Sequence, residues 1–220
     1  MSVLVPRQGT DPHRAAAWAW VRARYAEHHP GWEVVEGELP AGRPWCKADA
    51  VAAALERASG EVLVVADADC WAPGVGWAVD RVAAGAGWVV PHWLVHRLTP
   101  GATVAVLDGR ADLGSHLETA RDPYVGVQGG GVTVVHRETY RRVPLDRRFT
   151  GWGQEDMAWG RALRVLVGWE RQGLGPLWHL WHPPQPRLNA MWGSQESREL
   201  FLRYQQARTP EAMRALLADA

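Results

Sequence analysis

The sequence predicts an α/β fold with a mostly parallel central sheet and helices on both of its faces. Along the first half of the chain, short valine-rich apolar segments alternate with segments whose apolar residues recur at helical spacing. Residues 61–66 form the strongest apolar segment, and their lack of polar alternation is typical of a strand buried on both faces. The 220 residues are 47% hydrophobic and 22% charged, which is enough apolar mass for one sizeable core.

The individual elements follow from periodicity and from the residues that stop them. Pro30-Gly31 ends the first helix, Gly60 stops the second, and Pro183-Pro184 ends the last strand. In chain order, the expected strands are residues 3–6, 33–36, 61–66, 88–90, 132–135 and 177–182. The expected helices are residues 13–29, 47–59, 75–84, 137–142 and 155–166, and residues 102–122 are expected to include a loop.

No repeat, low-complexity linker or break in composition divides the chain. We therefore expect one domain over residues 1–190. Residues 191–220 are expected to form a polar helical tail, with Leu200, Phe201 and Tyr204 on its apolar face.

Charge and composition exclude several classes of protein. The 24 basic and 24 acidic residues balance, which argues against a protein that coats nucleic acid by bulk positive charge. The apolar stretches fall far short of the ~20 residues that span a bilayer, and no leader-like segment begins the chain, so we expect a cytoplasmic protein without membrane insertion. Cys46 and Cys70 are too few for a disulfide framework and are expected to be reduced thiols. Fourteen tryptophans and a single lysine, Lys47, are the unusual counts.

Two carboxylates, Asp67 and Asp69, follow the strongest strand. In an extended backbone, residues two apart point the same way, so both carboxylates are expected on one side of the strand end, where open α/β sheets bind ligands. Two adjacent carboxylates repel each other unless a cation lies beside them, and oxygen ligands suit Mg²⁺ or Mn²⁺. The alternative is that these residues only cap a loop.

Two histidines, His179 and His182, flank the end of the last expected strand. A spacing of three on a strand sends them to opposite faces, so one is expected to face a metal. The prolines that follow favour His182, where the chain leaves the sheet, and His179 stays an alternative. Each could instead be a hydrogen-bonded core residue.

A third segment, Gly-Trp-Gly-Gln-Glu-Asp at residues 151–156, combines a flexible loop with acids that open a helix. Acids in a first helical turn are favoured by the helix dipole, so simple capping is one interpretation. The other is a carboxylate general base at the lip of a site where a sugar lies against Trp152. The chain contains no Gly-rich phosphate loop and no Gly-x-Ser-x-Gly nucleophile motif.

In order and spacing, the three segments resemble GT-A glycosyltransferases of the family-2 type whose C-terminal half carries the galactosyltransferase Gly-Trp-Gly-Gly-Glu-Asp region. The resemblance covers residues 2–190, and Gln154 replaces the usual second glycine. The Trp-His-Leu-Trp-His-Pro segment at residues 178–183 and the arginine bias also resemble glycosyltransferases of actinobacterial bacteriophages. The resemblance implies a GT-A fold whose residues 1–100 bind the nucleotide sugar and whose residues 101–190 bind the acceptor.

The resemblance also implies a metal-dependent, inverting hexosyltransferase that moves a sugar from a nucleoside diphosphate, most often UDP, to a hydroxyl group. On the matching positions, Asp69 binds Mn²⁺ or Mg²⁺, and Asp67 contacts the ribose and the water shell of the metal. His182, or otherwise His179, completes the ligands. Asp156 is the base, and the adjacent Glu155 binds donor or acceptor hydroxyls.

Further positions match the nucleotide pocket of the family. Lys47 is the basic residue near the nucleotide, Pro6-Arg7 ends the first strand beside the pocket, and Glu36 or Glu38 lies near the base. The tryptophans within the motifs are expected to line the sugar site: Trp152, Trp178 and Trp181.

The acceptor is expected to be a Ser or Thr of a virion protein, a hydroxymethylated DNA base or a glycan, in the host cytoplasm if the chain is phage-encoded. A monomer or small homo-oligomer is expected. An arginine cluster near the acceptor side could contact phosphate or form a solvated face: Arg141, Arg142, Arg147 and Arg148. Two other functions remain open. A HAD-like phosphatase would carry its Asp-x-Asp after the first strand, and a non-catalytic sugar-binding module would not require the three aspartates.

Overall fold

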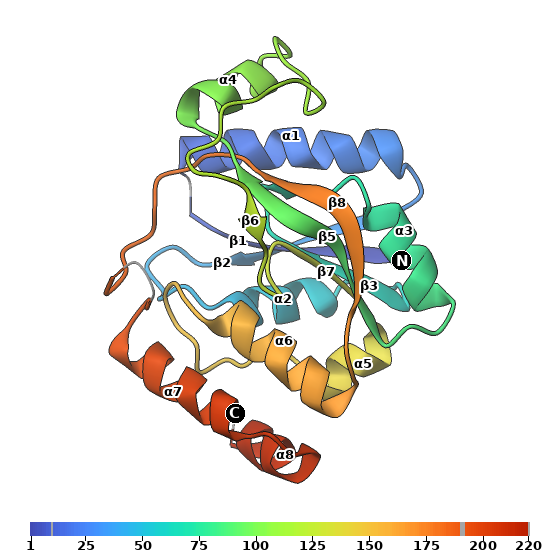
Figure 1. The fold of residues 1–220 in the computed structure, drawn as a ribbon, viewed down its shortest axis with the longest axis vertical. Helices are drawn as coiled ribbons and strands as arrows, with labels where there is room; N and C mark the ends of the chain where they lie inside the picture. Colours follow the sequence, from blue (N-terminus) through green and yellow to red (C-terminus); the bar gives the residue numbers. More distant parts are fainter. Residues whose placement is uncertain (10, 190–191, 220) are drawn as a thin grey trace.

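The computed structural model describes residues 1–9, 11–189 and 192–219. Its centre is an eight-stranded sheet in the order β2-β1-β3-β7-β5-β8-β4, with β6 paired to β5 (Figure 1). The strands are β1 (Ser2–Gln8), β2 (Glu33–Leu39), β3 (Val62–Ala66), β4 (Cys70–Trp71), β5 (Trp88–Arg97), β6 (Tyr124–Val125), β7 (Val132–His136) and β8 (Arg171–His179). The helices are α1 (Pro12–His28), α2 (Lys47–Leu55), α3 (Val75–Ala83), α4 (Pro100–Leu107), α5 (Arg137–Arg142), α6 (Glu155–Leu166), α7 (Gln195–Gln206) and α8 (Pro210–Ala218).

The sheet confirms the α/β class, but its strand directions are mixed. β1 runs parallel to β2 and β3, as strand–helix–strand alternation in the first half predicts. β7 is antiparallel to both β3 and β5, whereas β5 and β8 are parallel. Because β7 is antiparallel to both of its neighbours, β5 and β8 run in the same direction as β1, β2 and β3. The sheet is therefore mostly parallel, as expected, and β7, β6 and β4 are the reversed strands.

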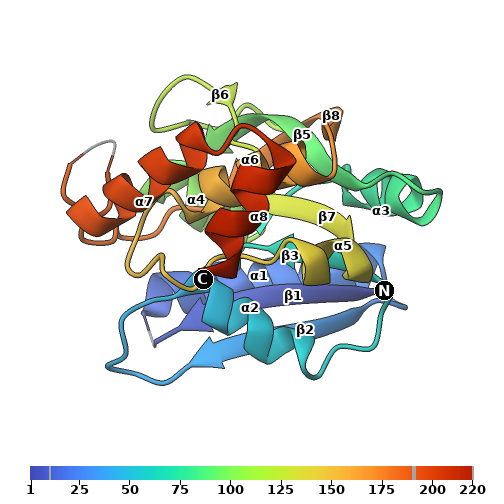
Figure 2. The same cartoon turned by 90° about the horizontal axis from the view of Figure 1, so that it is seen from below.

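Helices cover both faces of the sheet, and strand alternation divides the core between them. Val3 and Val5 of β1 pack with α1, α3 and α4 on one face. Leu4 of the same strand packs with α2, α6, α7 and α8 on the other. Figures 1 and 2 show α1 on one side of the sheet and α2 and α6 on the opposite side. No helix in the described part of the chain is long and apolar enough to cross a membrane.

Several elements differ from their expected bounds. β5 continues seven residues past Val90, because Pro91 lies at an irregularity in the β5–β8 register, where the missing N–H is tolerated. β8 starts at Arg171, six residues before its expected start, and ends at His179, three residues before its expected end. The glycines near the start of β8 suggest a loop from the sequence, but in the structure they let β8 pack closely against β5. A Cβ on Gly173 would lie only 2.4 Å from the Pro91 carbonyl oxygen.

Helix α4 replaces part of the expected loop at residues 102–122. Its start carries a recognisable signal, because the Thr99 hydroxyl accepts a hydrogen bond from the Ala102 N–H at 3.2 Å and Pro100 occupies the first turn. The two-residue strands β4 and β6 were not expected, since two residues hold no periodicity. α2 ends at Leu55, four residues before its expected end.

The C-terminal segment forms two helices, α7 and α8, that pack against α6. Their apolar side chains belong to the same core as those of α6, namely Leu200, Phe201, Tyr204, Met213 and Leu216. The Arg161 guanidinium of α6 donates hydrogen bonds to the backbone oxygens of Tyr204 at 2.6 Å and Gln205 at 2.7 Å. The proposed domain boundary between residues 190 and 191 lies outside the described residues.

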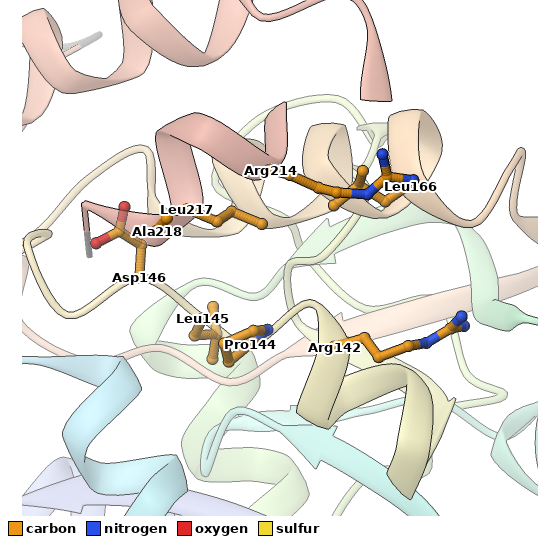
Figure 3. Close-up of a pocket in the computed structure, with 8 residues that line it drawn as sticks. All are labelled: Arg142, Pro144, Leu145, Asp146, Leu166, Arg214, Leu217 and Ala218. Atoms are coloured by element: carbon orange, nitrogen blue, oxygen red, sulfur yellow. The ribbon is translucent and has the colours of Figure 1, made fainter. Parts of the chain in front are cut away.

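A second set of contacts fixes α8. The Arg148 guanidinium binds Asp146 at 2.6 Å and the Leu216 carbonyl oxygen at 2.9 Å, and the Tyr204 hydroxyl donates to Asp146 at 2.7 Å. A pocket of about 230 Å³ lies between α8 and the segment that joins α5 to α6 (Figure 3). It is lined by Arg142, Pro144, Leu145, Asp146, Leu166, Arg214, Leu217 and Ala218.

Candidate functional site

The turn that follows β3 separates the two predicted aspartates. Residues 67–69 are not extended: the Cys70 N–H donates to the Asp67 carbonyl oxygen at 3.2 Å, and residues 68 and 69 form a turn. The alternation rule therefore does not apply, and the two carboxylates have different partners. Asp67 contacts Lys47, whereas Asp69 contacts the histidines.

Lys47 joins the first aspartate to the start of α6. Its Nζ lies 2.6 Å from Asp67 Oδ1 and 2.7 Å from Asp156 Oδ1. The ammonium is buried, which by itself lowers the pKa of a lysine, but the charges of Asp156 and Asp67 outweigh burial and raise the pKa of Lys47 well above its ordinary value. Lys47 is therefore a fixed positive charge between two carboxylates from distant parts of the chain.

The loop before α6 has a backbone that favours glycine. Gly151 and Gly153 adopt φ values of 75° and 125°, and Gln154 adopts φ 65° as the only non-glycine with positive φ among the described residues. The position where the resembling family carries glycine is thus left-handed in this chain. Because the chain reverses direction here, Glu155 and Asp156 form the first turn of α6.

Burial dominates the electrostatics of the two acids. It raises the pKa of Glu155, and the charge of Asp156 raises it further, against the attraction of Lys47. Burial also raises the pKa of Asp156, again against Lys47. The Glu155 carboxylate accepts a hydrogen bond from the Gly153 N–H at 3.1 Å. Raised pKa values near neutrality suit groups that exchange protons.

The glycine run at residues 129–131 allows α6 to approach β7 closely. A Cβ on Gly129 would lie 2.3 Å from the Asp156 carbonyl oxygen, and one on Gly130 would lie 3.2 Å from Asp156 Oδ2. The Gly131 carbonyl oxygen accepts from the Asp67 N–H at 2.8 Å. These glycines therefore form the wall that brings Asp67 and Asp156 together, a role that the sequence analysis did not assign to them.

Asp69 lies at the centre of the second cluster. β4 pairs antiparallel with the end of β8, with Cys70 opposite His179, and this pairing brings Asp69 to the histidines. Asp69 Oδ2 lies 3.2 Å from His182 Nε2, and Oδ1 lies 3.8 Å from His179 Nε2. Burial opposes ionisation of Asp69, but His179, His182 and an arginine outweigh it and hold the pKa of Asp69 below its ordinary value.

Both histidines face Asp69, which the expected alternation did not allow. β8 ends at His179, so the next three residues leave the strand and His182 returns to the same side. The two rings lie 5.1 Å apart between centroids. Burial lowers the pKa of His179 to about 4, so this imidazole is neutral at physiological pH.

Two arginines contact the histidines, and neither was singled out from the sequence. Arg97 Nη1 lies 2.9 Å from His179 Nε2, while His179 Nδ1 lies 2.9 Å from the Leu180 carbonyl oxygen. Arg14 Nη2 lies 2.7 Å from His182 Nδ1, and Arg14 Nη1 lies 3.5 Å from Asp69 Oδ2. The arginine-rich composition hides both residues, although Arg14 follows an Asp-Pro helix start directly after β1.

The second cluster has the donor chemistry of a cation site. Potential ligand atoms of Asp69, Cys70 and His179 all lie within 4.8 Å of one another. Burial raises the pKa of the Cys70 thiol well above its ordinary value, so this residue is a neutral thiol and a poor ligand. A buried carboxylate with imidazoles beside it fits a divalent ion such as Mn²⁺.

The carboxyl ends of β1 and β2 carry the predicted nucleotide-pocket residues. Pro6 pairs with Gly37, and the Arg7 guanidinium donates to the Glu36 carboxylate. Burial opposes ionisation of Glu36, but hydrogen bonds from Arg7 and Trp18, together with the charges of Arg7 and Arg22, outweigh it and lower the pKa of Glu36. Glu38 is exposed on the same strand. The parallel β1–β3 pairing places this end of β1 beside the carboxyl end of β3.

The motif tryptophans are half-buried and lie in separate places. The Arg187 guanidinium lies 5.3 Å from the Trp152 ring centroid, and Trp178 packs against His96 at 4.6 Å. Trp181 lines an apolar pocket of about 240 Å³ between α1 and α4. Three of the four predicted cluster arginines have acidic partners, whose pairs are Arg141–Glu138, Arg147–Asp49 and Arg148–Asp146.

No protein-family model matches the chain, and no curated protein matches its sequence. Similar solved structures include glucosyl-3-phosphoglycerate synthase from Mycobacterium tuberculosis in complex with Mn²⁺, UDP-Glc and phosphoglyceric acid. Its identity is 17%, over 94% of this chain and 78% of that one, with a TM-score of 0.48. A Drosophila galactosyltransferase in complex with manganese, UDP-Gal and xylobiose is 14% identical over 88% of this chain and 67% of its own, with a TM-score of 0.44. A further mycobacterial protein is 20% identical over 94% and 73%, with a TM-score of 0.48. At such identities, the reaction has to be inferred from the site itself.

Proposed function

We propose that the chain is a metal-dependent glycosyltransferase that moves a sugar from a nucleoside diphosphate to an acceptor hydroxyl with inversion. The observation that carries the proposal is the turn at residues 67–69, which joins two kinds of chemistry. On one side, Asp69 lies with the two histidines, and on the other, Asp67 is linked through Lys47 to Asp156. The proposed cation site and the proposed carboxylate base are thus joined by a single turn.

Asp69 and the histidines would hold the cation, with His182 at the shorter distance from the carboxylate. A bound Mn²⁺ or Mg²⁺ supplies charge neutralisation for the departing diphosphate. The buried position of Asp69 strengthens its attraction for a cation, because little water screens it. Asp67 pairs with Lys47 through Oδ1, and its more exposed side chain is proposed to contact the ribose and the water shell of the metal.

Asp156 is the proposed general base. It accepts the proton from the acceptor hydroxyl as that oxygen attacks the anomeric carbon from the face opposite the diphosphate. Lys47 favours the ionised form of Asp156 and holds its oxygen in place. Glu155, whose pKa is higher, is suited to bind sugar hydroxyls either as acceptor or as donor.

The donor proposal rests on the resemblance of the motifs to GT-A glycosyltransferases. Arg7 and Glu36 are proposed beside the nucleotide base, and a UDP-sugar is the proposed donor. Trp152 offers an apolar ring at the loop before α6, on which a sugar face can stack. The proposed acceptor is a hydroxyl of a protein side chain, a hydroxymethylated DNA base or a glycan, bound by the 101–190 half of a 1–190 domain.

The test combines binding with turnover. Calorimetric titration of UDP in the presence of Mn²⁺ measures donor-site binding, and release of UDP from a panel of UDP-sugars measures turnover. Asp156→Asn is expected to bind UDP like the wild type but to lose about 10²–10⁴-fold in turnover. Asp69→Asn is expected to lose the Mn²⁺-dependent part of UDP binding. Asp80→Asn, on the exposed face of α3, serves as the control.

Three results would contradict the proposal. Equal loss of UDP binding and turnover in Asp156→Asn would assign that residue a structural role. Full activity of Asp69→Asn with a chelator present would remove the metal from the reaction. Binding of UDP-sugar by the wild type without any turnover would favour the non-catalytic sugar-binding module.

A further inference from the structure

Arg14 occupies the place where a cation would bind. It lies in the first turn of α1, where its N–H donates to the Asp11 side chain at 2.9 Å, and its own side chain is 28% exposed. Its two Nη atoms reach His182 Nδ1 at 2.7 Å and Asp69 Oδ2 at 3.5 Å. The guanidinium thus contacts the carboxylate and an imidazole of the proposed metal ligands.

The hydrogen-bond roles follow from the chemistry of arginine, which only donates. His182 Nδ1 must accept from Arg14, although the same nitrogen also lies 2.8 Å from the Pro183 carbonyl oxygen. Nε2 of the same ring lies 3.2 Å from Asp69 Oδ2. Arg14 therefore shares both His182 and Asp69 with the proposed cation, and a cation that binds these two residues meets the guanidinium.

Arg97 is placed differently. Its Nε donates to the Tyr124 hydroxyl at 2.7 Å while Nη1 contacts His179. Among the described residues, Arg14 has only one further polar side-chain contact, with the Pro183 carbonyl oxygen at 3.5 Å. Arg97 is therefore held by Tyr124, away from the Asp69 carboxylate. The side chain of Arg14, in contrast, is held mainly by Asp69 and His182, the two residues that a bound cation would take from it.

We propose that Arg14 competes with the divalent cation for Asp69 and His182, and that it moves to the diphosphate of the nucleotide when the cation is bound. This inference rests on the proposed function. A guanidinium and a divalent cation repel each other at one carboxylate, so a released Arg14 needs an anion. A diphosphate is such an anion, and the planar guanidinium matches its oxygens in a bidentate way. The metal and the nucleotide consequently favour each other's binding.

The consequence is a measurable coupling between two ligands. By linkage, UDP must tighten Mn²⁺ binding by the same factor by which Mn²⁺ tightens UDP binding, and such factors are about 5–150-fold. Arg14 raises this factor in two ways, because it weakens Mn²⁺ binding without nucleotide and strengthens it with nucleotide. Loss of the guanidinium should therefore tighten the binding of Mn²⁺ alone. An arginine with a merely structural role would have the opposite effect, since its loss would loosen the ligands.

The experiment is calorimetric titration of the full chain with Mn²⁺ alone, UDP alone, and Mn²⁺ at saturating UDP. Arg14→Gln and Arg14→Met both remove the charge and are compatible with a helix. If one variant does not fold, the other still tests the proposal. In both, Mn²⁺ alone is expected to bind at least about 5-fold more tightly than to the wild type, and the coupling factor to fall at least about 5-fold. Arg14→Lys keeps the charge and is expected to keep the weak binding of Mn²⁺ alone. Arg24→Gln, which removes a half-buried charge that pairs with Glu27 on the same helix and does not contact Asp69 or the histidines, is the control.

The outcomes separate this inference from the proposed function. One outcome refutes the role of Arg14 and leaves the glycosyltransferase proposal standing. In it, the wild type binds Mn²⁺ and UDP together, but the charge-removing variants have the same coupling factor as the wild type or bind Mn²⁺ alone no more tightly than the wild type does. If the wild type binds neither Mn²⁺ nor UDP, the proposed function fails and this inference fails with it.

Discussion

Replacement of Lys47 by methionine should destabilise the protein, and more so at pH 8 than at pH 5. Methionine preserves most of the apolar stem of lysine but removes the ammonium that lies 2.6 Å from Asp67 and 2.7 Å from Asp156. The two carboxylates then face each other in a buried site without a counter-charge. Breaking a buried ion pair by removing one partner costs about 3–5 kcal/mol. Because the Asp67 side chain is 30% exposed and can turn toward water, we expect the lower end, about 3 kcal/mol at pH 8.

The pH dependence follows from the sign of the Asp156 shift. Burial raises the pKa of Asp156 from 3.8 to about 6, against Lys47. A carboxyl group whose folded pKa lies above its unfolded value binds extra protons in the folded state, so stability falls as the pH rises through that window. Without Lys47, the folded pKa rises further and the fall extends to higher pH. Each further pKa unit adds about 1.4 kcal/mol to the loss at pH 8 relative to pH 5.

Urea unfolding at pH 5 and pH 8 measures both quantities, with Arg24→Gln as a charge-removing control. The double variant Lys47→Met/Asp156→Asn should recover part of the stability that Lys47→Met loses at pH 8, because it also removes the unpaired charge. A loss below about 1 kcal/mol at pH 8, or one that is equal at both pH values, would refute the reasoning. The ammonium would then not be the group that keeps these carboxylates in place.

Three further changes test local features. Gln154→Gly should be about 1–2 kcal/mol more stable than Gln154→Ala in urea unfolding, because both lack the side chain and only alanine strains the left-handed backbone. Gly129→Ala should lower the unfolding free energy by about 1–3 kcal/mol, since its Cβ would meet the Asp156 carbonyl oxygen; an unchanged thermal midpoint would show that α6 shifts freely. Tyr204→Phe should cost about 1.5–3 kcal/mol at pH 7, because it removes a hydrogen bond to an ionised carboxylate. Burial opposes ionisation of Asp146, but Arg148 and Tyr204 outweigh it and lower the pKa of Asp146. The stability that depends on the ionised carboxylate is lost as the pH falls through that lowered value, so the cost of Tyr204→Phe should shrink in strongly acidic solution.

Local signals predicted the elements that they control. α6 begins at Glu155, as expected, because the acids of its first turn and the glycines before it act within a few residues. α4 was missed although Thr99 and Pro100 mark its start, since no polar face accompanies its apolar residues. β8 was misplaced because its glycines and Pro176 suggest a loop, whereas close packing against β5 uses the space that the glycines leave.

The candidate site divides in the same way. The order of the three motifs predicted which residues to examine, but not their partners. Lys47 and Asp156 are 109 residues apart, and nothing in the spacing shows that one ammonium bridges two carboxylates. The rule of alternation excluded one histidine because it assumes that the strand continues to His182. β8 ends at His179, the last residue that it pairs with both β5 and β4, and β4 is a two-residue strand without a signal of its own.

The packing of α7 and α8 on α6 has a consequence for biosynthesis. The contacts that hold α7 and α8 to the segment before α6 join residues far apart in the chain. Tyr204 lies 58 residues after Asp146, and Arg148 binds the Leu216 carbonyl oxygen across 68 residues. Such long-range contacts form late, because the intervening loop must close first. While the chain emerges from the ribosome, the helix with Glu155 and Asp156 therefore stays uncovered until α8 has been made.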